Sequence, residues 1–466
     1  MKTNRRINLT TIAAAVMAVG YVAGLELRNR AFTMLHNQGL ILGVNSFNKQ
    51  ETVAFETVFE AFEDGLVVSN LFNKYEVDGQ LAERSGNTIW RPQPYIAQSF
   101  TGIDQSANFD RNYTQLSVPS NLGYSHSVPL TLSATELRDK LQSKSLGKAA
   151  MQRLASDINV DCSNLAALTG TVFVKRTGAA SGFDDVAAID TAFNRLGVSM
   201  DSRKALYSSG DYNSMASNLA LRTLDNSKSL TAYEKAAVGS IANFDLYKLD
   251  YAYRLTAAVG VACTINGANQ YYVPKATSTA ATGEMSNVDN RFQSITIAVT
   301  SGTVKAGDAF VLAGVNEVHH ITKADTGSQK TFRIISQVSG AAGGSGVYQI
   351  CPPIISAGGG SDPEKQYQNV TATPANGAAI TWLNTVSGAA NPFWQEEAFE
   401  ITPGKYEPED ASGLAIMSAT TENGVVVTMA RQGSIGDLKT KYRWDVYYGL
   451  LNKQPEMSGV EMFSQT

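Results

Sequence analysis

The clearest amphipathic pattern in the chain lies in residues 147–168. Apolar residues recur there at helical intervals while polar residues occupy the other faces, which predicts a helix over 147–168. Ser143 or Ser145 can cap its start, and Gly170 can end it. Cys162 lies on the apolar side and is therefore interpreted as a small core residue. The apolar positions are Met151, Leu154, Ile158, Cys162 and Leu165.

Two shorter helices are predicted on the same grounds. Residues 51–63 place four apolar residues on one face, and Gly65 follows them. Residues 184–197 begin with Asp184 and Asp185, whose negative charges suit the positive end of a helix. An acidic pair in this position is interpreted as a cap and not as a catalytic dyad. The apolar face of the first helix consists of Phe55, Val58, Phe59 and Phe62.

The stretch from residue 84 to 127 has almost no helical period and is rich in polar and aromatic residues. It predicts a long extended excursion that forms a two-stranded arm, and such long loops are usually functional. A strand pair has too little apolar surface to be stable alone. The arm should therefore rest on something else, for which a second subunit is a natural candidate.

Residues 263–385 have a different texture, rich in Gly, Ser, Thr and Ala. Short apolar runs separated by glycine-rich turns predict a small β-sandwich or barrel. Because helices and strands precede this block and further strands follow it, the block is predicted to be inserted into a larger α+β domain. Among the following strands, Asn423-Gly424 predicts a two-residue type I′ hairpin turn. The apolar runs in the block are 295–299, 309–312, 331–335 and 347–350.

The N-terminus allows three interpretations. Lys2, Arg5 and Arg6 precede an apolar run over residues 7–25, which is how a secretory signal begins. The same run could be an apolar arm that packs on a neighbouring subunit, and it is marginal as a spanning helix. Translation could also start at Met34.

The charge composition of the chain argues against nucleic-acid binding and favours contact with other protein. Of the 466 residues, 38 are Lys or Arg and 42 are Asp or Glu, a net charge of −4 that gives no basic field for nucleic acid. The length corresponds to about three domains. Only 17% of residues are charged, below the roughly 25% of ordinary soluble domains, so much of the surface is expected to meet other protein.

No catalytic, cofactor-binding or metal-ligating residues are predicted, and the chain is not expected to be an enzyme. The three cysteines form no C-x-x-C pair, and phosphate-loop, nucleophile-elbow, H-E-x-x-H and calcium-loop motifs are missing from the sequence. His319 and His320 are adjacent, so on a strand they point to opposite faces and are poorly placed to bind one ion. Residues 358–363 are interpreted as a flexible turn.

Seven short motifs occur in a fixed order from about Phe55 to the C-terminus. Together they resemble the major capsid (coat) protein of short-tailed bacteriophages. That family has the variety of the Hong Kong-type phage capsid fold that carries an inserted small β-barrel. The motifs are 85–92, 137–139, the helix 147–168, 288–292, 307–310 with 313–315, 391–394, and 432–435 with 447–449.

The resemblance implies an α+β fold with a definite domain order. The chain would comprise an N-terminal extension (1–49), an N-arm (50–83), an extended loop (84–127), a peripheral domain (128–176) with a spine helix (147–168), an axial domain (177–262), an inserted β-barrel (263–385) and a return to the axial and peripheral domains (386–466).

The resemblance also implies two contact regions. The extended loop would reach over an adjacent subunit. A second loop, at about 273–287, would touch the neighbouring capsomer. Only Lys275 and Glu284 are charged in that second loop, so strong salt bridging is not expected there. The contact residues implied for the extended loop are Thr88, Ile89, Trp90 and Arg91.

The function implied is structural. The chain would self-assemble in the host cytoplasm into hexamers and pentamers of an icosahedral head, directed by a scaffolding protein. Further partners would be a portal and packaged double-stranded DNA, the DNA only non-specifically, with no membrane; the final location is the virion capsid. The alternative is a secreted or surface-layer carbohydrate-binding protein, favoured by the N-terminus and the Gly/Thr-rich block, and a hydrolase ranks third.

Overall fold

The computed structural model describes residues 41–42, 55–56, 59–60, 62–63, 65–75, 88–109, 111, 113–136, 140–220, 239–406, 414–421, 424–434 and 436–466. It combines helices and strands, as predicted for an α+β chain. Contacts divide the chain into two units, each assembled from separate segments. The first unit comprises 1–65, 125–155 and 403–448, and the second comprises 66–124, 156–402 and 449–466.

The first unit contains an antiparallel ladder of β1 (Ile41–Leu42), β21 (Ala415–Thr420), β22 (Val426–Gly433) and the first part of β23 (Lys439–Asn452). Thr420 pairs with Val426, so residues 421–425 connect β21 to β22. This register does not fit the predicted two-residue turn at Asn423-Gly424, of which Asn423 lies outside the described residues. Val425 is buried; Thr421 N donates to Val425 O at 3.0 Å, and Val425 N donates to Thr421 Oγ1 at 3.1 Å.

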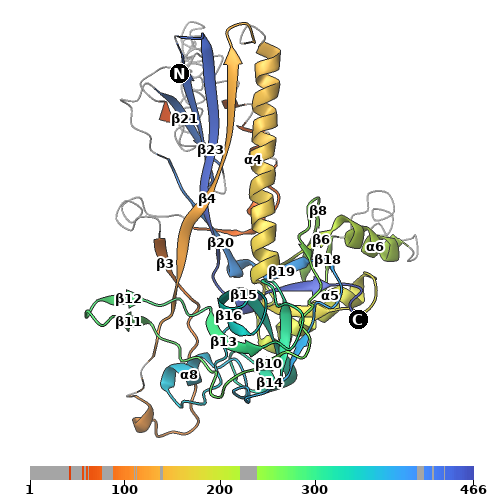
Figure 1. Cartoon of the computed structure of the whole chain (residues 1–466), viewed down its shortest axis with the longest axis vertical. Helices are drawn as coiled ribbons and strands as arrows, with labels where there is room; N and C mark the ends of the chain where they lie inside the picture. Colours follow the sequence, from red (N-terminus) through yellow and green to blue (C-terminus); the bar gives the residue numbers. More distant parts are fainter. Residues whose placement is uncertain are drawn as a thin grey trace, which may run out of the picture. The chain divides into compact units, whose positions relative to one another are not determined.

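The helix predicted over 147–168 is α4 (Lys140–Thr169), which begins earlier than expected (Figure 1). Ser143 and Ser145 lie inside the helix and do not cap it. The strong helix propensities of Lys140, Leu141 and Gln142 favour the earlier start, which adds about two turns. The end agrees with the prediction, because Gly170 follows it and donates to Ala166 O at 3.2 Å. Met151, Leu154, Ile158 and Cys162 are all buried.

The predicted apolar face near residue 60 is also present. The described residues of that stretch, 55–56, 59–60 and 62–63, are helical, and Phe55, Phe59 and Phe62 are buried. The apolar run 7–25, Met34 and the motif 137–139 lie outside the described residues. Within the described residues, none of the helices is both long and apolar enough to cross a bilayer.

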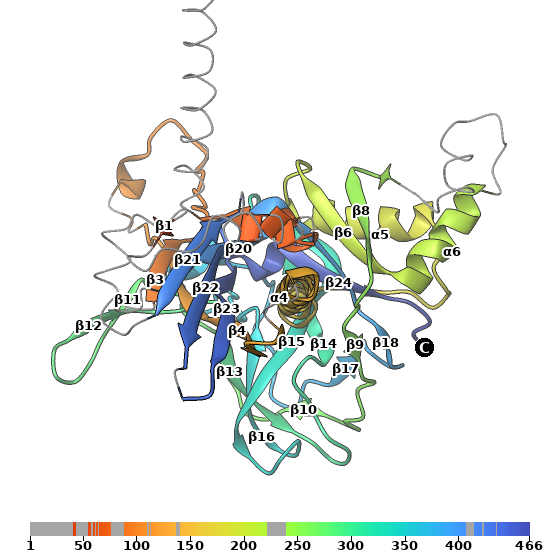
Figure 2. The same ribbon diagram turned by 90° about the horizontal axis from the view of Figure 1, so that it is seen from above.

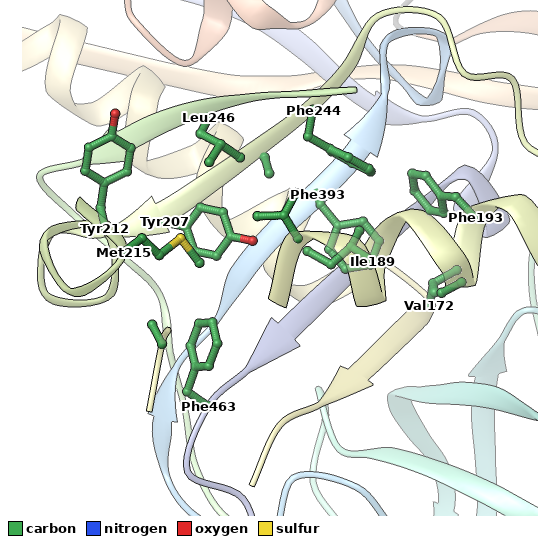
Figure 3. Packing of buried hydrophobic residues seen from close by; sticks show 14 of the residues in the cluster. Val172, Ile189, Phe193, Tyr207, Tyr212, Met215, Phe244, Leu246, Phe393 and Phe463 are labelled. Atoms are coloured by element: carbon green, nitrogen blue, oxygen red, sulfur yellow. The ribbon is translucent and has the colours of Figure 1, made fainter. Parts of the chain in front are cut away.

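The second unit contains a six-stranded sheet in the order β5-β24-β19-β6-β8-β7. Helices α5 (Phe183–Leu196) and α6 (Ser209–Ala220) lie beside it (Figure 2). Aromatic side chains from helix and sheet pack between them, with Phe193 and Phe393 at a centroid distance of 5.0 Å (Figure 3). The strands are β5 (Val172–Lys175), β24 (Ser458–Met462), β19 (Asn391–Gln395), β6 (Arg203–Ser208), β8 (Phe244–Leu249) and β7 (Ser240–Ile241).

Helix α5 confirms the helix predicted over 184–197, and of the acidic pair Asp185 has the capping role. The Asp185 carboxylate accepts hydrogen bonds from the backbone amides of Ser181 and Gly182, at 2.6 and 3.1 Å. The Arg176 guanidinium lies 2.7 Å from the same carboxylate. At the other end, Gly197 takes the left-handed conformation, φ +78°, that closes the helix.

A second six-stranded sheet occupies residues 264–382, in the order β10-β13-β16-β15-β14-β17. Its two edges are joined by backbone hydrogen bonds, from Ile265 N to Ala378 O and from Ile380 N to Cys263 O, both at 3.0 Å. The sheet therefore closes on itself around an apolar core that includes Ile295 and Ile297. The strands are β10 (Thr264–Ile265), β13 (Gln293–Ala298), β16 (Gly346–Cys351), β15 (Asp325–Gly340), β14 (Ala309–Val318) and β17 (Ile380–Trp382). We refer to residues 263–385 as the closed-sheet segment.

Candidate assembly surfaces

The arm predicted from residues 84–127 contains β3 (Thr88–Pro92), which pairs antiparallel with β4 (Ser117–Ser133). All four contact residues implied for this loop lie on β3. Thr88 Oγ1 donates to Asn121 Oδ1 at 2.8 Å. The Ile89 side chain is buried within its own chain, whereas Trp90 is half-buried.

Arg91 has strong partners inside the chain. Its Nε lies 2.7 Å from Glu400 Oε1 and its Nη2 lies 3.3 Å from Glu400 Oε2, a bidentate arrangement. The guanidinium carbon also lies 3.3 Å from the centre of the Tyr75 ring. Arg91 therefore fixes the arm to the rest of its own unit. Of the four residues, Ile89 is buried, whereas Thr88, Trp90 and Arg91 are each half-buried.

The second contact region is a hairpin of β11 (Thr277–Thr279) and β12 (Met285–Asn287), which extends away from the closed sheet (Figure 1). Every residue of both strands is exposed, and each strand pairs only with the other. Lys275 lies at the base and Glu284 in the turn, and both are exposed. An isolated two-stranded ribbon is marginally stable, so its base must hold it.

Asn290 clamps that base. Its side chain is buried, accepts from Lys275 N at 2.9 Å and donates to Lys275 O at 2.8 Å. It also donates to Val288 O at 2.9 Å and accepts from Tyr272 OH at 3.0 Å. Next to the clamp, Ser117 of the arm forms a β-bridge with Asp289. The structure thus brings the bases of the two predicted contact regions together.

Between its two strands the arm carries a long loop, residues 93–116, that rests on helix α8 (Asp362–Tyr367). Gln366 Oε1 accepts from Thr114 N at 3.1 Å, and Gln366 Nε2 donates to Ile96 O at 3.0 Å. Tyr367 OH donates to Thr114 O at 2.7 Å. The loop is thus supported by its own chain, through the closed-sheet segment.

Helix α8 corrects the interpretation of residues 358–363 as a flexible turn only. Ser361 Oγ accepts from Glu364 N at 3.4 Å, and the Glu364 carboxylate accepts from Ser361 N at 3.0 Å. This is a capping box, with Pro363 in the first turn. The S-x-x-E pattern was the sequence signal for this helix, and the preceding glycines obscured it.

A buried carboxylate joins the closed-sheet segment to the C-terminal part of the chain. Glu456 lies in the 3-10 turn η6 (Pro455–Met457), and three side chains of the closed-sheet segment contact its carboxylate. Lys330 Nζ lies 2.5 Å from Oε1, Asn369 Nδ2 donates to Oε1 at 3.1 Å, and His320 Nε2 lies 3.3 Å from Oε2. Lys330 and Glu456 are both buried. We refer to these four residues as the Glu456 cluster.

Charge within the Glu456 cluster is set by burial and by Lys330. Burial alone would raise the pKa of Glu456, but the Lys330 ammonium and its hydrogen bond lower this pKa to about 2. Burial lowers the pKa of His320 to about 4, so the imidazole is neutral at pH 7. At neutral pH the ion pair in the cluster is therefore formed by Lys330 and Glu456, and His320 takes no part in it as a charged group. No sequence pattern predicted it, because its members come from distant segments.

The turn between β14 and β15 also packs on the end of α5. His320 N donates to Leu196 O at 3.0 Å, and Arg195 Nε lies 2.9 Å from Glu317 Oε1. A Cβ at Gly197 would lie 2.5 Å from the His319 ring, so no side chain fits there. The adjacent histidines thus have packing roles, and among the described residues no group of three or more His, Cys, Asp or Glu side chains is placed to hold a metal ion.

Comparison with known proteins gives a family model and several solved structures that match most of the chain. The family model "P22 coat protein - gene protein 5" matches residues 44–464. Among solved structures, the CUS-3 coat protein I-domain is 38% identical and has a TM-score of 0.21, and the match covers 26% of this chain and 96% of that one. A chain of Mycobacterium phage Che8 is 10% identical with a TM-score of 0.41, covering 85% and 90% of the two chains. A chain of the capsid of cyanophage P-SCSP1u is 10% identical with a TM-score of 0.40, and the match covers 85% of this chain and 87% of that one.

Proposed function

This chain belongs to the P22 coat protein family, and we propose that it is a major capsid protein that assembles, directed by a scaffolding protein, into hexamers and pentamers of an icosahedral head around double-stranded DNA. The observation that carries the proposal is the family match from residue 44 to 464. Family membership also favours this function over the carbohydrate-binding alternative.

The physical features of the chain support a shell subunit. The arm and the β11–β12 hairpin expose strands that internal clamps hold in place, and such surfaces suit contact with neighbouring copies. Many modest contacts repeated around a closed shell give high overall stability through multivalency. The weak negative charge gives little grip on DNA, which a head must release again. A portal and a scaffolding protein are the further partners we propose, with assembly in the host cytoplasm.

We propose domain roles on the same basis. Helix α4 would be the spine helix, the arm would be the extended loop, and the closed-sheet segment would be the inserted β-barrel. Thr88 and Trp90 would meet an adjacent subunit, while Ile89 and Arg91 would hold the arm in position for it. Lys275 and Glu284 would lie at the contact between capsomers.

Assembly of the purified chain tests the proposal. The full-length protein, alone and with the scaffolding protein encoded by the same phage, would be concentrated and examined by sucrose-gradient sedimentation and negative-stain microscopy. Closed shells are the expected result. A chain that stays monomeric under both conditions at high concentration would contradict the proposed function.

Removal of the β11–β12 hairpin is expected to separate folding from assembly. We expect replacement of residues 277–287 by a Gly-Ser linker to leave the midpoint of urea unfolding nearly unchanged, because every residue of the two strands is exposed. Shell yield should fall at least tenfold, since a contact worth about 1.4 kcal/mol corresponds to a factor of ten. Gradient sedimentation of equal amounts of folded subunit measures the yield.

The matched control keeps the hairpin and removes its charges. Lys275→Ala with Glu284→Ala should assemble nearly as well as the unaltered chain, because exposed ion pairs contribute little. Loss of shells in this double variant, equal to the loss on hairpin removal, would show that charge carries the contact. Normal shells from the variant without the hairpin would show that the hairpin makes no contact needed for assembly.

A further inference from the structure

A cavity of about 210 Å³ lies where four segments of the second unit meet. Its wall is formed by β4 of the arm, the last turn of α4, the closed-sheet segment and the end of β23. These segments contribute, among others, Pro119, Leu165, Phe292 and Leu451. The volume exceeds the roughly 150 Å³ of an engineered apolar cavity that binds benzene, so one aromatic ring fits.

The lining of the cavity changes from a buried floor to an accessible rim. Cys351 and Leu451 are buried, Leu165 and Phe292 are half-buried, and Asn121 is exposed. A small molecule can therefore enter from solvent beside Asn121 and reach the buried floor. Most of the lining side chains are apolar, so contact with them favours an apolar ligand.

Asn452 gives the cavity one polar group whose orientation is fixed. Its Nδ2 donates to Thr169 Oγ1 at 2.9 Å and to Ser458 Oγ at 3.1 Å. Both hydroxyls spend their own protons elsewhere, because Thr169 Oγ1 donates to Leu165 O at 2.7 Å and Ser458 Oγ donates to Pro455 O at 2.9 Å. The two hydroxyls can therefore only accept from Asn452, and the atom that faces them must be the amide nitrogen.

The carbonyl end of the same amide is left as an acceptor. Asn452 is buried and lines the cavity, and its Oδ1 has no hydrogen-bond partner among the described residues. A buried acceptor without a donor costs free energy. A ligand with one O–H or N–H group would supply the missing donor.

The charge balance of the cavity favours a neutral ligand. Arg291 lines it, but its Nη2 lies 2.6 Å from Asp289 Oδ2 and its Nε lies 2.9 Å from Asp289 Oδ1. Arg291 Nη1 donates to the backbone oxygen of Asn452 at 2.9 Å. A charged ligand would lose its hydration and find no unpaired counter-ion there. Phosphates, carboxylates and ammonium groups are therefore disfavoured.

We propose that this cavity binds a neutral, single-ring aromatic molecule with one hydrogen-bond donor, of which phenol is the simplest example. The ring lies among Leu165, Phe292 and Leu451, and the donor reaches Asn452 Oδ1. Because such a ligand contacts the arm, α4 and the closed-sheet segment at once, it stabilises the folded subunit. The site belongs to a single subunit and is therefore independent of the proposed function.

Fluorine NMR of a small probe gives the first test. Unassembled full-length subunit should broaden the fluorine signal of para-fluorophenol, with a dissociation constant of about 1 mM for so small a ligand. Para-difluorobenzene has the same ring without a donor and should bind at least tenfold more weakly. Equal affinity for the two probes, or no broadening with the phenol at about ten times that concentration, would overturn the proposal.

A larger side chain in the cavity tests its location. Leu165→Trp places a ring in the space of the ligand and should abolish the broadening, while the midpoint of urea unfolding does not fall. The matched control is Leu438→Trp, at a leucine that is 69% exposed and does not line the cavity, and it should bind as the unaltered chain does. Unchanged binding by Leu165→Trp, or loss of binding in the control, would overturn the proposal.

Hydrogen exchange of the unaltered chain locates the site without any substitution. Para-fluorophenol should slow exchange in peptides that cover residues 165–170 and 449–455, and leave β14 unaffected. At ten times the dissociation constant, it should also raise the equilibrium constant for folding about elevenfold. Protection confined to other segments would overturn the proposal. Binding by free subunits that disappears in assembled shells would identify a neighbouring copy as the occupant of the cavity and would overturn it as well.

Discussion

Replacing Glu456 by leucine is expected to lower the free energy of unfolding by about 3–5 kcal/mol, because it leaves a buried charge without its partner. The Lys330 side chain is 3% exposed, and its ammonium lies 2.5 Å from the Glu456 carboxylate. Asn369 Nδ2 would lose an acceptor in the same place. Urea unfolding of the unassembled subunit, followed by tryptophan fluorescence, measures the loss.

Two variants distinguish this ion pair from a general effect of mutation. Adding Lys330→Met to Glu456→Leu should recover most of the lost stability, because apolar replacement of both partners of a buried pair is close to neutral. Asp437→Asn, which breaks an exposed pair with Lys439, should leave the free energy of unfolding nearly unchanged. A loss below 1 kcal/mol for Glu456→Leu alone would show that the Glu456 cluster does not hold the segment in place.

The loss of stability expected for Glu456→Leu would show that the closed-sheet segment stabilises the rest of its unit. Lys330, His320 and Asn369 all belong to that segment, while Glu456 precedes β24 of the other six-stranded sheet. A segment that only shared a chain with this sheet would unfold without affecting it. Through the cluster, loss of the segment leaves a buried carboxylate uncompensated, so the two sheets should unfold together.

Local patterns carried most of the secondary structure that the sequence predicted. Ile295 and Ile297 alternate with polar residues because one face of β13 is buried, and the apolar positions of α4 repeat at helical spacing for the same reason. Boundaries were less certain, since Lys140 to Gln142 favour a helix by propensity while the apolar repeat in the sequence starts only at Met151. The hydrogen bonds between Thr421 and Val425 that fix the register before β22 also leave no sign in the Asn-Gly pair.

The assembly surfaces were predictable in part. The arm was expected from residues 84–127, which lack a helical period, and the loop at about 273–287 was implied by the resemblance. The structure has a strand pair in the first and a hairpin in the second, and their contact roles stay predictions. The partner of Arg91 is Glu400, 309 residues away, and Thr114 and Gln366 are 252 residues apart. Pairs so distant leave no periodic trace, because only the folded chain brings them together. For the same reason, the sequence could not show that Ile89 is buried while Ile103 is exposed.

Glu461 provides a titratable probe of the sheet core in the second unit. It lies on β24, is 0% exposed, and accepts a hydrogen bond from Tyr207 OH at 2.8 Å. Its Oε1 has no hydrogen-bond partner among the described residues. Burial raises the pKa of Glu461 to about 8; the Tyr207 hydrogen bond and Arg176 oppose that rise, and the Asp185 and Asp211 carboxylates add to it. Tyr207 appears within the aromatic core in Figure 3.

Replacing Glu461 by glutamine is therefore expected to stabilise the subunit by about 3 kcal/mol at pH 7 and to have little effect near pH 4.5. The ordinary pKa of this carboxyl is 4.5, below its folded value, so unfolding releases a proton between these limits. The carboxyl's contribution to stability is complete below pH 4.5 and is lost as the pH rises toward 8, whereas glutamine does not titrate. Urea unfolding at pH 5, 6, 7 and 8 measures the growing difference. A pH-independent difference for Glu461→Gln would show that the buried carboxyl is ionised in the folded chain.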